Sequence, residues 1–117
     1  MTVMFNELVT ALQALGTPAA GRATIPFYAG EMHCAEPNYG TVRIDGEGEA
    51  LWADGEQQEQ AIQGSIDVFI HEKDIQPIAA VQGILKAQGV SYKLYSIQHE
   101  TARKLIHYEW VFELEAL

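Results

Sequence analysis

The chain has 117 residues, which suits a single domain, 1–117, built around one hydrophobic core. An apolar fraction of 48% and a charged fraction of 20% are typical of a globular protein and exclude an intrinsically disordered chain. With 16 acidic and 7 basic residues the net charge is −9, which disfavours specific nucleic-acid binding because phosphate contacts require cations.

The N-terminal residues do not have the basic start of a secretion signal, since Glu7 is the only charged residue before Leu15. No segment approaches the roughly 20 consecutive apolar residues that a membrane span requires. The single cysteine, Cys34, cannot form an internal disulfide. The sequence therefore predicts an intracellular protein with no membrane partner, held together by packing alone.

The first predicted element is a helix over residues 3–15. Its apolar residues recur at the spacing of one helical face: Phe5, Leu8, Val9, Leu12 and Leu15. Thr2 is the expected N-cap. Gly16 is expected to end the helix in the left-handed conformation, because Pro18 follows shortly after it.

The segment 17–38 is the least regular part of the chain. Within it, Ile25–Ala29 is apolar enough for a short strand, which Pro26 would restrict to a sheet edge. The next predicted strand is Tyr39–Asp45, with Val42 and Ile44 on one face.

Gly46 and Gly48 are expected to turn the chain after this strand. Leu51 and Trp52 then begin another extended segment, and Asp54-Gly55 is a strong signal for a tight turn.

The second half of the chain is more regular. Residues 62–71 alternate between apolar and polar, which predicts a strand with one buried face. A second helix follows, with Asp74 as its expected N-cap and Pro77 in its first turn, where a missing N–H is tolerated. This helix is expected to run to about Gln88 and to end at Gly89.

Two final strands are predicted at Val90–Ile97 and Lys104–Glu115, joined by the polar connection His99–Arg103. One face of the last strand is apolar: Ile106, Tyr108, Trp110, Phe112 and Leu114. Runs of strands set apart from helices predict an α+β fold, a largely antiparallel β-sheet with two main helices packed on one side.

Apolar residues cover more than half the circumference of the second helix: Ile75, Ile78, Ala79, Val81, Ile84 and Leu85. Two explanations stay open. The helix can also contact the first helix, or its outer flank, with Val81 and Ile84, can contact another subunit.

Aromatic residues gather on the last two strands, where they could pair across the strands within the core: Tyr92, Tyr95, Tyr108, Trp110 and Phe112. Trp52, next to Leu51, lies instead beside an acidic hairpin tip. A Trp on a projecting hairpin is either a core residue or an anchor for a protein–protein interface.

Histidines and cysteine do not form a recognisable metal or protease motif. His99-Glu100 would need a second His where Arg103 stands. His33 and Cys34 have no second pair at zinc-like spacing. His107 is predicted to be a solvated strand histidine rather than a metal ligand.

The acidic run Asp45, Glu47 and Glu49 lacks the calcium-loop pattern and is interpreted as a solvated hairpin. Neither a nucleophile elbow nor a phosphate-binding glycine loop occurs in the sequence. We therefore expect no catalytic residue, no cofactor and no metal, and predict a protein that is not an enzyme.

From Trp52 onward the chain shows a characteristic succession of segments: Ala53-Asp54-Gly55, the strand Ile66–Ile70, the charged link His71–Asp74, a helix ending in Ala87–Val90, then Tyr92–Tyr95 and the strand His107–Glu113. The start of the first helix, Met4–Leu8, fits the same pattern. In order and spacing this succession resembles the small tail-completion, or tail-terminator, proteins of long-tailed bacteriophages and prophages.

The resemblance implies a structural role in virion assembly, with no catalytic residues to transfer. Such proteins close the end of the tail tube, usually as a homo-hexameric ring, and present the surface to which head-connector proteins dock. The expected location is the cytoplasm during assembly and the virion tail after incorporation. Acidic residues near the central channel would repel DNA; the candidates are Glu47, Glu49, Asp54 and Glu56.

Two other function classes stay open. The chain could be a small dimeric ligand-binding or regulatory module, with Asp54–Gly64 as its ligand loop. It could also be an enzyme whose site residues are scattered along the sequence, in which case a carboxylate or histidine with a perturbed pKa would mark the site.

Overall fold

The computed structural model describes residues 4–30, 37–47, 52–53, 56–57 and 62–114. The elements in chain order are α1 (Phe5–Gln13), a 3₁₀ turn (Ala14–Gly16), β1 (Phe27–Ala29), β2 (Tyr39–Glu47), β3 (Trp52–Ala53), β4 (Glu56–Gln57), β5 (Ile62–His71), α2 (Gln76–Gln88), β6 (Ser91–Glu100) and β7 (Leu105–Leu114).

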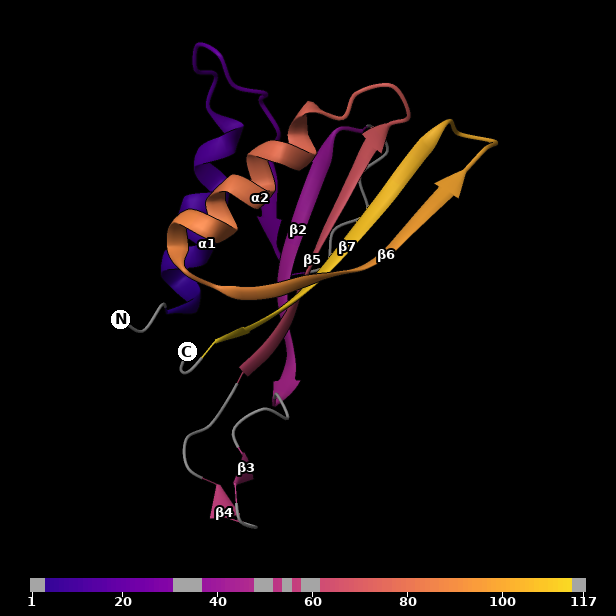
Figure 1. The fold of residues 1–117 in the computed structure, drawn as a ribbon. Coiled ribbons are helices and arrows are strands. Elements are labelled where there is room, and N and C mark those ends of the chain that lie inside the picture. Colours follow the sequence, from indigo (N-terminus) through magenta and orange to yellow (C-terminus); the bar gives the residue numbers. More distant parts are fainter. Residues whose placement is uncertain (1–3, 31–36, 48–51, 54–55, 58–61, 115–117) are drawn as a thin grey trace.

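Five strands form one mixed sheet in the order β1-β2-β5-β7-β6, and α1 and α2 lie on the same side of it (Figure 1). The pairs β2–β5, β5–β7 and β6–β7 are antiparallel, and only β1 pairs in parallel, with β2. This confirms the α+β fold with a largely antiparallel sheet. It also confirms that the segment around Pro26 lies at a sheet edge.

The last strand does not lie at the edge but between β5 and β6. From β5 the chain crosses through α2 to β6, and the tight turn 101–104 then brings β7 back beside β5. Strand composition agrees with this order. The sequence of β7, LIHYEWVFEL, is more apolar than that of β6, SYKLYSIQHE, and the more apolar strand occupies the central position, where most of its residues are buried or half-buried.

The first helix is shorter than predicted. It begins at Phe5, with Met4 in the N-cap position, whereas the expected cap Thr2 lies outside the described residues. At its other end the chain tightens into the 3₁₀ turn Ala14–Gly16. The φ angle of Gly16 is not positive, so the predicted left-handed ending is wrong.

The second helix ends as predicted and begins differently. Gly89 has φ of 70°, and Val90 N–H donates to the carbonyl of Leu85 at 3.1 Å, the pattern of a left-handed helix terminus. Pro77 lies in the first turn. Asp74 is not the N-cap, a position that Ile75 takes, because the Asp74 carboxylate accepts a hydrogen bond from Asn38 Nδ2 at 2.9 Å.

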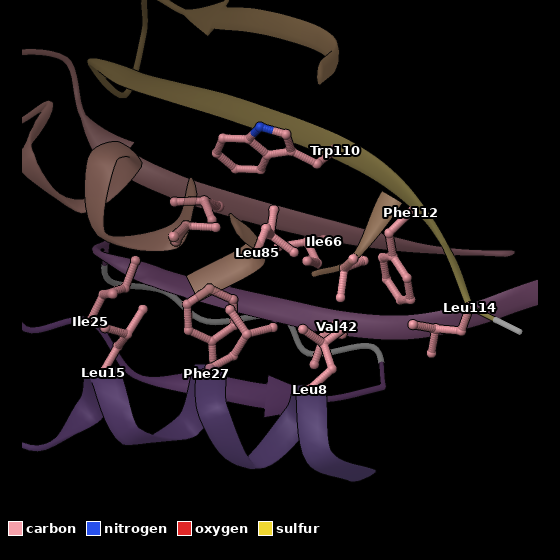
Figure 2. Close-up of a cluster of buried hydrophobic side chains, with 14 of the residues drawn as sticks. Leu8, Leu15, Ile25, Phe27, Val42, Ile66, Leu85, Trp110, Phe112 and Leu114 are labelled. Carbon is pink, nitrogen blue, oxygen red and sulfur yellow. The ribbon is translucent and has the colours of Figure 1, made fainter. Parts of the chain in front are cut away.

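The core lies between the helices and the sheet (Figure 2). Trp110 and Phe112 on β7 and Ile66 on β5 face Leu85 of α2 and Leu8 of α1, and all five are at most 1% exposed. At about 1.5–3 kcal/mol per fully buried large apolar side chain, this layer is the main source of stability.

The broad apolar surface of α2 is explained by packing within the chain, since α2 contacts α1 and its buried residues belong to the same core cluster as those of the sheet. Val81 is fully buried and Ile84 is half-buried against the same core. The side chain of Val81 is therefore not available to a neighbouring subunit, because packing between α2 and the sheet encloses it. Ile75, by contrast, is 65% exposed.

Strands β2 and β6 run further than predicted, to Glu47 and Glu100. In β2 the register shifts between Ile44 and Gly46, so Asp45 occupies a β-bulge. Gly46 therefore continues the strand instead of turning the chain, and Gly48 lies outside the described residues.

Strands β3 and β4 pair antiparallel as a separate two-stranded sheet. The turn predicted at Asp54-Gly55 lies outside the described residues. This β3–β4 hairpin projects beyond the end of β2 and β5, away from the main sheet (Figure 1).

Among the helices of the described ranges, none has the length and apolar composition needed to cross a membrane.

Candidate functional site

The sheet face opposite the helices, called the open face below, carries a polar and aromatic cluster at its centre. Register places Thr41 of β2 beside Asp67 of β5, and Asp67 beside Glu109 of β7. The next row along the strands is Tyr39, Phe69 and His107. Side chains far apart in the sequence therefore share one small area because three strands align.

Asp67 is the centre of this cluster, and its side chain is only 7% exposed. One carboxylate oxygen, Oδ2, accepts a hydrogen bond from Arg43 Nη1 at 2.5 Å. The other, Oδ1, lies 2.7 Å from His107 Nε2. An ionised carboxylate can only accept, so Nε2 of His107 carries the donated proton.

A second carboxylate extends the network. Arg43 Nε donates to Asp45 Oδ1 at 3.0 Å, and the Ser65 hydroxyl donates to Asp45 Oδ2. The bulge in β2 occurs at Asp45. One guanidinium thus bridges two carboxylates, and the planar fork of Arg suits this role better than an ammonium group.

An aromatic stack borders the network. The rings of Tyr39 and Phe69 are 4.8 Å apart, and those of Phe69 and His107 are 4.2 Å apart, with near-parallel planes in both pairs. Stacking on Phe69 and the hydrogen bond to Asp67 together fix the orientation of the imidazole.

The cluster shifts the pKa values of its charged groups. Burial raises the pKa of the Asp67 carboxyl, but the hydrogen bond with His107 and the charge of Arg43 outweigh it, so the pKa lies below the ordinary value. For Arg43 burial acts in the opposite direction and lowers the pKa. The carboxylates of Asp67 and Asp45 outweigh this effect, so the pKa of Arg43 lies above its ordinary value. Both groups stay charged near neutral pH.

The lowered pKa of Asp67 predicts a pH dependence of stability. The ordinary pKa is 3.8, so the carboxylate stabilises the fold above this pH, and its contribution is lost as pH falls through the folded-state value. We expect the difference in unfolding free energy between wild type and Asp67→Asn to be largest near neutral pH and to shrink below about pH 4. Urea unfolding at both pH values measures it, and an unchanged difference would contradict the assignment.

Chemically, the cluster orients an imidazole with a carboxylate, the arrangement that positions a general base in many enzymes. The nearby Ser65 hydroxyl, however, donates to Asp45 and not to His107. Across the described ranges, no group of three or more His, Cys, Asp or Glu side chains is arranged to hold a metal ion.

Several of the predicted site residues lie where the structure describes no side chain. Leu51, Glu49 and Asp54 are outside the described residues. Trp52 and Glu56 belong to β3 and β4, and Glu47 ends β2, all three as backbone positions. Of the predicted interface residues, only Val81 and Ile84 have described side chains, and both belong to the packing of α2.

Sequence reasoning missed the charged cluster. The predictions that the polar side chain of Asp67 lies on the exposed face of β5 and that His107 is solvated are wrong, since both side chains are at most 20% exposed. No local signal marks the burial of Asp67, because the alternation in β5 groups it with the polar residues; the side chains of Arg43 and His107, from the neighbouring strands, cover it.

Exposed apolar residues on β6 were also missed: Leu94 at 43%, Tyr95 at 66% and Ile97 at 46% exposure. The expected burial of Tyr95 among the core aromatics is wrong, because Tyr95 occupies a bulge in the pairing with β7.

No family model matches this chain, and no curated protein matches it.

Proposed function

We propose that this protein is a structural subunit of phage tail assembly, of the tail-completion type, that closes the end of a tail tube as a homo-oligomeric ring. The β3–β4 hairpin supports this role, because it projects from the main sheet as a separate element (Figure 1). A ring requires one patch of a subunit to contact a different patch on the next, and a projecting arm provides such a patch.

In this proposal Trp52 anchors the arm on the neighbouring subunit, together with Leu51. The acidic residues Glu47, Glu49 and Glu56, with Asp54, repel the DNA that passes the channel. The partners are further copies of the chain, tail-tube proteins and head-connector proteins, first in the cytoplasm and then in the virion tail.

Light scattering over a concentration series, followed by negative-stain imaging of the largest species, tests the ring. We expect closed rings with a central hole and six subunits in each ring. We expect Trp52→Ala to abolish the rings and Trp52→Phe to retain them, with circular dichroism unchanged in both variants. Loss of folding in Trp52→Ala would place Trp52 in the core and contradict its role in the arm.

The charged cluster of the open face favours a second candidate, a small dimeric ligand-binding or regulatory module. A guanidinium on a side chain that is 32% exposed, beside an oriented imidazole, is suited to a polar ligand. Native mass spectrometry distinguishes the two. A small molecule retained after purification, with no ring at any concentration, would favour this candidate over tail assembly.

A further inference from the structure

Strand β6 is a long edge strand with apolar side chains exposed to solvent. It has 10 residues and lies at one edge of the sheet. Within the described part of the chain it pairs only with β7. Leu94, Tyr95 and Ile97 are between 43% and 66% exposed. An unpaired edge with exposed apolar residues is a template for pairing with another chain.

The opposite edge of the sheet differs. Strand β1 has only three residues, and Pro26, directly before it, has no backbone N–H to donate. A continuous sheet between two copies therefore cannot join β6 of one to β1 of the other over any useful length. Among the described strands only β6 has a long free edge, so pairing of two copies edge to edge would join β6 to β6 in a two-fold, antiparallel arrangement.

We propose that two copies of this chain pair through β6 to form one continuous ten-stranded sheet, with the two-fold axis between Tyr95 and Ser96. In this register Leu94 of each copy lies opposite Ile97 of the other. Both residues lie on the helix side of the sheet, because their partners on β7 are Trp110 and Tyr108, which face the core.

The same register matches the remaining residues of the strand. Lys93 and Gln98 lie opposite each other on the open face, since they pair with Val111 and His107 of β7. Lys93 is then diagonal to Glu100 of the second copy, at a distance that long side chains can span. A slip of one residue would place Leu94 opposite Gln98, which belongs to the other face, so this register is specified by the side-chain pattern.

The pairing uses a different surface from the β3–β4 hairpin and does not rest on the tail-assembly proposal. A one-directional ring contact cannot be two-fold. Variants of the two surfaces therefore separate the two proposals: Trp52→Ala should abolish rings and keep the β6 pair, and β6 variants should do the reverse.

The first test is analytical ultracentrifugation of wild type and of the double variant Leu94→Lys/Ile97→Lys, at concentrations below ring formation. We expect the wild type to form a dimer. The dissociation constant of the variant dimer should be larger by about a hundredfold or more, since each substitution acts twice at a two-fold interface. Ile75→Lys, at an apolar position that is 65% exposed on another surface, is the control and should leave the dimer unchanged. A wild-type monomer, or a dimer that survives the double substitution, would overturn the proposal.

Cross-linking tests the register itself. In a Cys34→Ser background, Leu94→Cys and Ile97→Cys chains are mixed and oxidised. Residues directly opposite on antiparallel strands lie within disulfide distance. We expect disulfide-linked dimers in the mixture and little in either variant alone. Equal cross-linking of Leu94→Cys with itself would show another register and overturn the arrangement.

Discussion

Gly64→Ala is expected to destabilise the protein by about 3 kcal/mol or more, at the upper end for an overpacked core position. A Cβ atom at Gly64 would lie 2.3 Å from the carbonyl oxygen of Arg43 and 2.4 Å from the ring of Phe112. The first of these atoms belongs to the backbone of the adjacent strand, so it can move only if the β2–β5 pairing is distorted. Urea unfolding measures the loss.

Gly83→Ala is the matched control. Gly83 lies inside α2, and a Cβ there would meet nothing within 4 Å. Because Gly costs roughly 0.5–1 kcal/mol relative to Ala in a helix interior, this variant should be more stable than wild type by about that amount. Equal unfolding free energies for the two variants would contradict the close approach of β2 and β5 at Gly64.

Asp67→Ala is expected to cost about 2–3 kcal/mol of unfolding free energy. Removing one partner of a buried ion pair usually costs ~3–5 kcal/mol, and solvent reduces the loss here because the Arg43 side chain is 32% exposed. Asp45→Ala, which removes a carboxylate that is itself 32% exposed, should cost less than about 1 kcal/mol. Chemical denaturation of both variants at neutral pH measures the two costs.

A double variant separates the loss of the pair from the loss of packing. Arg43→Met/Asp67→Leu removes both charges and keeps apolar volume, so it should recover much of the stability that Asp67→Ala loses. If the double variant is as unstable as Asp67→Ala, the cost does not arise from an uncompensated guanidinium but from packing on the open face and from the hydrogen bond that His107 Nε2 loses in both variants.

Elements in which the apolar periodicity and the residues at the ends favour the same structure were predicted correctly from sequence. In α2, Pro77 in the first turn and Gly89 at the end bound an apolar repeat, and the structure ends the helix where Gly89 takes the left-handed conformation. In β7, strict alternation identified the buried face that carries Trp110 and Phe112. In both elements the local chain chemistry and the tertiary packing favour the same conformation.

Helix starts were less predictable, because competing partners decide them. Asp74 has the right side chain for an N-cap, but Asn38, 36 residues earlier in the chain, engages its carboxylate. No local pattern contains that contact. The end of α1 also differs from the prediction. Residues Ala14–Gly16 form a 3₁₀ turn, so Gly16 does not take the predicted left-handed conformation.

The sequence by itself determined the fold class, the strand alternation, the edge position of the Pro26 segment and the acidic charge of the chain. These follow from periodicity, backbone chemistry and composition, which are local properties. Only the tertiary structure decided that β7 lies between β5 and β6, and this order leaves β6 as the open edge. The same alignment of strands buries Asp67 between Arg43 and His107. The β6 edge and the charged cluster around Asp67 both depend on which strands become neighbours. Strand order is set by packing across the whole sheet.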